Sequence, residues 1–333
     1  MAMTVQAFLA KADAAPLEGY SDTFRFRFHA LGTMNDILFR AASRARAAVF
    51  RDAALEWIRA YEARHSVFIS DSMISKINAA AGAAWVDIPP ETEALFRLCD
   101  WYVWMTKGLL DPTAGPLLQL WDFRASPSRV PSEAQVREAL SRIGWEKVLR
   151  QDAKVFLSCP GMKLDLGGIG KEYAVDRLVQ LAAENGVRDI LVDLGHDIRA
   201  AGVAPDGGPW RVGLEHPQSP GRCWGEVVLD NAALCCSGNY ARYFEVEGRR
   251  YSHLINPRTG YPADSGCDAA WVHAATAVEA GALSMLAVML GPDEGLPVIQ
   301  QTQAAEGCLW LDGRCHQTRR FHVQVHTVAS HVA

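Results

Sequence analysis

The sequence predicts an α+β protein with one large domain. Segments with the two-residue alternation of strands and segments with helical spacing follow one another without strict alternation. The chain has 333 residues, of which 49% are hydrophobic and 21% are charged, as is typical of globular rather than disordered proteins. We expect a loose leader at residues 1–20, a single domain at residues 21–325 and a polar tail at residues 326–333.

The first half of the chain contains one strand pattern and three helix patterns. Phe24 to Phe28 alternate apolar and basic residues, as in a strand with one buried face. Asp52 to His65 and Glu91 to Lys107 have the apolar spacing of amphipathic helices. Ser132 and Gln135 form a capping-box pattern, which predicts a helix that begins after Ser132.

The middle of the chain predicts a strand, a tight turn, a helix and a second strand. The expected bounds are Met162 to Leu166, Gly167 to Gly170, Lys171 to Asn185, and Ile190 to Leu194. A glycine turn that opens a helix directs backbone N–H groups toward an anion, and Lys171 adds a full positive charge. Taken alone, this pattern also fits a plain structural turn.

The last third of the chain predicts short strands and one long helix. Strand patterns lie at Trp210 to Leu214, Gly225 to Leu229 and Tyr243 to Val246, and another follows residue 320. Ala277 to Leu290 is expected to be helical, because its apolar run ends at a Gly-Pro pair.

Composition argues against several classes of partner. The formal net charge is −5 and there is no long basic block, so we expect no nucleic acid partner. No apolar run is long enough to span a bilayer, so we expect no membrane association. The N-terminus is a poor signal peptide, so we expect a cytoplasmic location, with a removed leader as the alternative. The eight cysteines form no Cys-x-x-Cys motif and are expected to be free thiols, with a redox pair at Cys235-Cys236 as the alternative.

Several segments resemble one known family, in the order in which they occur there. Leu164-Asp165-Leu166-Gly167-Gly168-Ile169-Gly170-Lys171-Glu172-Tyr173-Ala174-Val175-Asp176-Arg177 resembles the signature of ApbE-type FAD:protein FMN transferases, whose usual form is Asp-Leu-Gly-Gly-Ile-Ala-Lys-Gly-Tyr-Ala-Val-Asp. Further segments that resemble family motifs are Gly32-Thr33-Met34, Ser70 to Asn78, Asp111 to Leu117 with Trp121, Cys236 to Tyr240, and Ser252 to Gly260.

The resemblance implies a fold, a substrate and a reaction. The fold would be ApbE-like (T-fold-like), with mixed sheets packed against helices in a single flavin-binding domain. The family cleaves the pyrophosphate of FAD, transfers FMN to a Thr or Ser hydroxyl of a target flavoprotein, and releases AMP. Some members instead hydrolyse FAD to FMN and AMP, and Mg²⁺ carries much of the electrostatic load.

The residues expected at the FAD site are Asn78, Asp165, Gly167, Gly168, Gly170, Lys171, Gly195, His196, Ser237, His253, Arg258 and Thr259. His253 is the candidate general base, because imidazole titrates near neutral pH; the alternative is a hydrogen bond to FAD or to the following loop. Asn78 has a helix-end cap as its alternative role, and Thr259 has fixation of its own turn. His196 stands where the family usually has Gly, and it either contacts the flavin or is an ordinary loop histidine. Asp176 either orients the glycine turn of residues 167–170, which we call the cradle, or lies on a solvated helix face.

The metal positions depart from the family pattern. The resemblance implies a Mg²⁺ ion held by the backbone carbonyl of Gly170 and by an Asp and a Thr on the last helix. Those two positions are Gly281 and Met285 here, and neither side chain is a hard oxygen ligand. We therefore expect Mg²⁺ binding to be weak or absent. Glu172, which replaces a family Gly, is the candidate substitute ligand, with repulsion of the pyrophosphate as the alternative role. Ser284 is expected to point elsewhere.

Three functions follow from these observations. The first is an FAD:protein FMN transferase with an impaired or rebuilt metal site. The second is a protein that binds FAD without cleaving it, such as a flavin carrier, a pseudoenzyme or a flavin-dependent redox enzyme. The third is a Mg²⁺-dependent FAD pyrophosphatase, against which the missing ligands count most.

Overall fold

A computed structural model describes residues 15–123, 129–240 and 242–325. Within these ranges, nine strands form one antiparallel sheet in the order β1-β2-β3-β7-β8-β11-β14-β15-β16. Their bounds are β1 (Glu18–Tyr20), β2 (Thr23–Ala30), β3 (Thr33–Arg40), β7 (Ile190–Leu194), β8 (Asp197–Ala201), β11 (Ala233–Gly238), β14 (Cys267–Ala274), β15 (Glu306–Leu311) and β16 (Arg314–Gln317).

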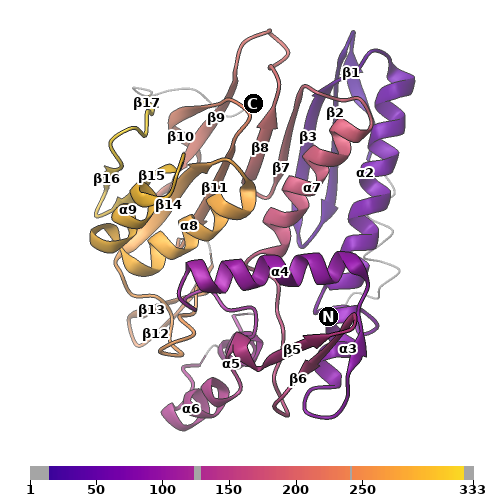
Figure 1. The fold of residues 1–333 in the computed structure, drawn as a ribbon. Coiled ribbons are helices and arrows are strands. Elements are labelled where there is room, and N and C mark those ends of the chain that lie inside the picture. The colour runs from indigo at the N-terminus through magenta and orange to yellow at the C-terminus, as the bar shows by residue number, and fades with distance from the viewer. Residues whose placement is uncertain (1–14, 124–128, 241, 326–333) are drawn as a thin grey trace.

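Four helices cover one face of this sheet (Figure 1). Their bounds are α2 (Arg44–His65), α7 (Gly170–Glu184), α8 (Ala277–Leu290) and α9 (Pro292–Gln301). Helix α7 packs on β7 and β8, and α8 packs on β11 and β14, so the two helices lie next to each other. Helix α8 is buried on almost every side, which explains why its sequence is apolar with little periodicity.

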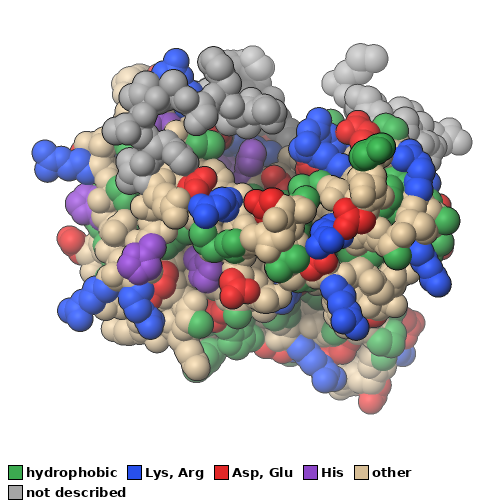
Figure 2. Space-filling model, turned by 90° about the horizontal axis from the view of Figure 1, so that it is seen from above, with side chains coloured by type: hydrophobic (Ala, Val, Ile, Leu, Met, Phe, Trp, Pro, Cys, Tyr) green, Lys and Arg blue, Asp and Glu red, His purple; other side chains and the backbone are tan. Residues whose placement is uncertain are grey.

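The opposite face of the large sheet is covered by a second, three-stranded sheet. It consists of β9 (Trp210–His216), β10 (Ser219–Leu229) and β17 (Gln324–Val325) in the order β17-β10-β9. Tryptophans pack between the two sheets, among them Trp210, Trp271 and Trp310. Acidic and basic side chains are interspersed on the face seen in Figure 2.

Shorter elements lie at the end of the large sheet where α7 begins. Helix α4 (Pro90–Met105) runs across this end, below α7 and α8 in Figure 1. The short helices here are α3 (Met73–Ala79), α5 (Gly115–Trp121), α6 (Glu133–Ser141) and the 3₁₀ turn η1 (Trp145–Lys147). A small sheet contains β4 (Val86–Asp87), β6 (Lys154–Leu157) and β5 (Val148–Gln151) in that order. A separate hairpin consists of β12 (Tyr243–Val246) and β13 (Arg249–Ser252).

The predicted α+β class is confirmed, and so are the helix and the strand that follow the glycine turn. Helix α8 has the predicted bounds, α7 differs by one residue at each end, and β7 buries alternate residues as expected. The capping box of Ser132 and Gln135 is present at the start of α6. Among the described residues, no helix has the length and apolarity needed to cross a membrane.

Other predicted bounds are wrong. Met162 to Leu166 is not a strand, because its only ladder contact is a bridge between Lys163 and Ala114. Helix α2 begins at Arg44, not at Asp52, since Ser43 caps its first turn. Residues 18–20 are part of the sheet, so the predicted leader overlaps the domain. Residues 1–14 and 326–333 lie outside the described residues.

His65, at the end of α2, makes the stability of the fold depend on acidity. The ring is buried between the carbonyl oxygen of Tyr61, 3.1 Å from Nδ1, and the hydroxyl of Thr92, 3.0 Å from Nε2. Burial lowers the pKa of His65 from 6.5 to about 4. The unfolded chain therefore binds more protons than the folded one between these two values, and stability falls as the pH is lowered through this window.

We expect His65→Gln to remove part of this acid sensitivity. One proton over about 2.5 pH units corresponds to about 3 kcal/mol of unfolding free energy. The loss of stability between pH 6.5 and pH 4 should therefore be smaller in the variant by up to about this amount. Urea denaturation at the two pH values measures it, and equal losses in both proteins would refute the role of His65.

Candidate functional site

A turn of three residues, 167–169, leads into α7 and forms the centre of the candidate site. The N-cap residue of α7 is Ile169, whose side chain makes no capping hydrogen bond. The first turn of a helix has N–H groups without intrahelical partners, and its dipole favours negative charge. This end of α7 is therefore suited to hold a phosphate group.

Two polar side chains hold the segment before the turn. The Asn78 amide donates to the carbonyl oxygen of Leu164 (2.9 Å) and its Oδ1 accepts from the Leu164 N–H (2.7 Å). The Asp165 carboxylate accepts from the N–H of Gly167 at 2.8 Å. Both residues therefore shape the backbone of the cradle, and Asn78 does not cap its own helix.

Two buried tyrosines that the sequence analysis missed hold the turn from the other side. The Tyr61 hydroxyl, from α2, donates to the carbonyl oxygen of Gly170 at 2.9 Å, and the Tyr102 hydroxyl, from α4, donates to that of Gly168. Burial raises the pKa of both phenols well above their ordinary value, so both remain donors at neutral pH. No local pattern marks these residues, because their partners lie far away in the chain.

Lys171 lies in the first turn of α7 and is already paired. Its ammonium group forms an ion pair with the buried carboxylate of Asp197, at the start of β8, and donates to the carbonyl oxygen of Gly195 at 3.2 Å. Although burial lowers the pKa of Lys171, the carboxylates of Asp197 and Glu172 raise it above its ordinary value. Lys171 thus links the glycine turn to the β7–β8 hairpin and remains charged.

The hairpin itself contains Gly195 and His196, both with positive φ angles of 59° and 71°. This is the geometry of a two-residue type I′ turn, in which a non-glycine residue is uncommon. A Cβ on Gly195 would lie 2.7 Å from Thr33, so glycine is required there. The His196 N–H donates to the Asp193 carboxylate at 2.8 Å, and the exposed imidazole stands at the tip of the hairpin.

On helix α8, the two positions where the family resemblance implies metal ligands, Gly281 and Met285, face the cradle. A Cβ on Gly168 would lie 3.4 Å from the methyl carbon of Met285. A Cβ on Gly281 would lie 2.6 Å from Cγ of Glu172. The face of α8 that carries residues 281 and 285 therefore packs against the start of α7.

The side chains of Ser284 and Asp176 both have defined partners. Ser284 is buried, and its hydroxyl lies 2.8 Å from that of Ser237 on β11, so it points at a predicted site residue. Asp176 does not lie on a solvated face. Its carboxylate accepts from the N–H groups of Ala277 (2.9 Å) and Val278 (3.1 Å), and pairs with Arg199 at 2.6 Å. It therefore joins α7 to the start of α8.

The segment from His253 to Thr259 forms a second group of contacts. His253 Nδ1 lies 3.1 Å from the carbonyl oxygen of Arg242, and burial lowers the pKa of its ring. The Arg258 guanidinium donates to the carbonyl oxygen of Lys107, which follows α4. Thr259 Oγ1 accepts from the N–H of Tyr261 at 3.3 Å, so this hydroxyl stabilises its own turn.

The chain also matches a known family. The model of the ApbE family matches residues 31–309. The chain belongs to the ApbE family. The predicted family resemblance is thereby confirmed, and it covers both the cradle and the segment around His253.

Individual ApbE-family proteins are similar over different parts of the chain. A protein of Haemophilus influenzae named FAD:protein FMN transferase is 32% identical over 209 residues, which are 60% of each chain. A protein of the same name from Escherichia coli K12 is 31% identical, over 64% of this chain and 63% of its own. The crystal structure of the ApbE protein of Thermotoga maritima is 31% identical and superposes with a TM-score of 0.81, over 90% of this chain and 98% of that one.

The metal-ligand set of this ApbE-family chain is small. In the described parts of the chain, no group of three or more His, Cys, Asp or Glu side chains is arranged to hold a metal ion. The Gly170 carbonyl accepts from Tyr61, and Met285 is a thioether. The carboxylate of Glu172 remains, and one carboxylate with phosphate oxygens and water is a set that Mg²⁺ uses.

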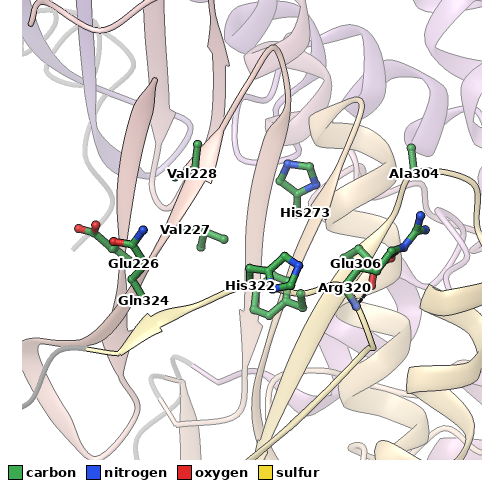
Figure 3. A pocket seen from close by; sticks show the side chains of 10 residues that line it. Glu226, Val227, Val228, His273, Ala304, Glu306, Arg320, His322 and Gln324 are labelled. Carbon is green, nitrogen blue, oxygen red and sulfur yellow. Dashed lines mark hydrogen bonds and ion pairs between the residues drawn. The ribbon is translucent and has the colours of Figure 1, made fainter. Parts of the chain in front are cut away.

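A cavity of about 430 Å³ lies away from these residues (Figure 3). It is lined by β10, the β14–β15 region and the segment before β17, with Val227, His273 and Phe321 among its residues. No residue predicted for the FAD site lines it. The side chain of His273 faces this cavity.

Proposed function

We propose that this chain is an FAD:protein FMN transferase. The observation that carries the proposal is the glycine turn at the uncapped start of α7, with Lys171 and the two tyrosine-held carbonyls around it. Two relatives, 32% and 31% identical to this chain, have that name. The chain matches 60% and 63% of the length of those two relatives.

The proposed reaction is a displacement at phosphorus. The hydroxyl oxygen of a Thr or Ser on the target flavoprotein attacks the FMN phosphorus of FAD, the bond from that phosphorus to the bridging oxygen breaks, and AMP leaves with the electron pair. The N–H groups at the start of α7 and the charge of Lys171 stabilise the pyrophosphate as negative charge moves onto the leaving group. A Mg²⁺ ion, when bound, would neutralise further charge on these oxygens.

His253 is proposed to accept the proton of the attacking hydroxyl. A carbonyl oxygen only accepts hydrogen bonds, so the contact with Arg242 assigns the proton of the neutral ring to Nδ1. Nε2 is then the unprotonated nitrogen. Burial lowers the pKa of this imidazole, which keeps it neutral and able to act as a base at pH 7.

The remaining predicted contacts are part of the same proposal. Gly195 and His196 would approach the cofactor from the β7–β8 hairpin, and Ser237 would do so from β11. Arg258 would contact the cofactor or the target from its position beside the end of α4. The side chains of Ser237 and Arg258 already have protein partners, whereas the imidazole of His196 is exposed.

Product analysis tests the transferase proposal. We expect incubation with FAD, Mg²⁺ and an acceptor flavoprotein domain to release AMP and to leave FMN covalently bound to a Thr or Ser of the acceptor. We expect His253→Ala to lower the transfer rate by about 10²- to 10⁴-fold. FAD affinity should stay within about threefold of the parent, because a general base contributes to the reaction rather than to binding. His316→Ala, on an exposed position of β16, is the matched control.

A second candidate function is supported by Gly281 and Met285. These residues leave α8 without a carboxylate or a hydroxyl at the two positions that face the cradle. Under this alternative, the protein binds FAD and retains it intact. It binds Mg²⁺ weakly or not at all. A yellow purified protein that releases no AMP would support the second function and contradict the first.

The proposed location is the cytoplasm, with FAD and a target flavoprotein as partners. All eight cysteines are free thiols in the structure, including the adjacent Cys235 and Cys236. Free thiols of this number suit a reducing compartment, where disulfides are rare. Labelling of the thiols in protein isolated from cells, before and after reduction, tests the location.

A further inference from the structure

The side chain of Glu172 on α7 fills the space beside Gly281 on α8. Glu172 points from the first turn of α7 into the space beside Gly281 on α8. A Cβ added at Gly281 would lie 2.6 Å from Cγ, 3.0 Å from Oε1 and 3.2 Å from Cδ of Glu172. Real Cβ atoms do not approach other carbon atoms this closely, so a side chain at position 281 and the observed Glu172 side chain exclude each other.

In the part of the chain that the structure describes, one oxygen of the buried Glu172 carboxylate lacks a hydrogen-bond partner. The residue is 6% exposed, and its Oε2 has no hydrogen-bond partner in the described residues. The nearest cation, Lys171, is committed to Asp197 and Gly195. An unsatisfied buried polar atom in a native protein requires an explanation, and a bound ion is one.

The surroundings of this carboxylate identify the class of ligand. It stands on the first turn of α7, beside the glycine turn that is proposed to hold the pyrophosphate of FAD. Oxygen ligands from one carboxylate and from phosphates, completed by water, suit a small hard divalent cation. The nearby thioether of Met285 suits a soft metal, but a single thioether is a poor site without a thiolate or imidazole.

We propose that Glu172 is the carboxylate ligand of a Mg²⁺-type cation that binds together with FAD, and that Gly281 is the residue that makes room for it. A carboxylate has moved from α8, where the family resemblance implies an Asp, to the facing position on α7. The inference rests on the proposed function, because the pyrophosphate of FAD supplies the other ligands. It favours a rebuilt metal site over an absent one.

Binding of Mn²⁺ tests the proposal without relying on turnover. Mn²⁺ accepts the same oxygen ligands as Mg²⁺ and is detected directly by electron paramagnetic resonance. We expect Mn²⁺ to bind to the protein saturated with FAD, and Glu172→Gln, which keeps the shape of the side chain, to raise the Kd by tenfold or more. Glu184→Gln, in the last turn of α7 and paired with Arg177, is the control and should leave the Kd unchanged.

A double variant tests the exchange itself. Glu172→Gly with Gly281→Asp returns the carboxylate to α8, and we expect it to bind Mn²⁺ within about threefold of the parent. Unchanged Mn²⁺ affinity in Glu172→Gln would overturn the ligand assignment. A folded double variant as weak as Glu172→Gln would overturn the exchange. Flavin fluorescence titration without metal is run on every variant, so a protein that does not bind FAD at all counts against the proposed function instead.

Discussion

Replacing Lys171 by Ala is expected to lower the free energy of unfolding by about 3–5 kcal/mol and to abolish measurable FAD binding. The substitution leaves the buried Asp197 carboxylate without its cation and removes the hydrogen bond to Gly195. It also removes the one charge that links the glycine turn to the β7–β8 hairpin. Urea denaturation and flavin fluorescence titration measure the two effects separately.

A double-mutant cycle separates the ion pair from the phosphate contact. Lys171→Ala with Asp197→Ala removes both charges, so we expect it to be more stable than Lys171→Ala while FAD binding stays weak. Arg177→Ala is the control on the same helix, because its pair with Glu184 lies at the surface and contributes at most about 1 kcal/mol. A stable Lys171→Ala protein that binds FAD normally would show that the cradle is placed wrongly.

The effect of Gly281→Ala on the free energy of unfolding is expected to change sign with the residue at position 172. In the parent, Gly281→Ala places a methyl group 2.6 Å from Cγ of Glu172, and overpacking of this kind costs about 1–3 kcal/mol. In Glu172→Gly the same space is empty. Ala is favoured over Gly inside a helix by about 1 kcal/mol, so Gly281→Ala should then stabilise α8. Gly281→Asp should be worse still in the parent, because it brings a second carboxylate beside the first.

Thermal denaturation of the four proteins in this cycle gives the result. The parent, the two single variants and the double variant are compared at one pH and without metal. A destabilising Gly281→Ala in both backgrounds would mean that neighbours other than Glu172 require the glycine. Gly313→Ala is not a suitable control. A Cβ there would meet nothing within 4 Å, but the φ of 72° would strain the alanine backbone.

Some features of the fold and site depend on residues close together in the sequence, and these were predicted. The start of α6 follows from a capping box within four residues, the end of α8 from a Gly-Pro pair, and the burial of β7 from simple alternation. The family motifs located the glycine turn and the substituted metal positions. Such signals act over a few residues, where propensity and capping determine the backbone.

The tertiary structure alone decided how these pieces work together. Met162 to Leu166 has a strand pattern but no strand to pair with, and Asn78 from α3 holds its backbone instead. Tyr61 reaches Gly170 across 109 residues of sequence. The side chain of Glu172 occupies the space beside Gly281 because α7 and α8 pack against each other. Contacts between distant segments depend on which surfaces the whole fold brings together, and no local pattern encodes that choice.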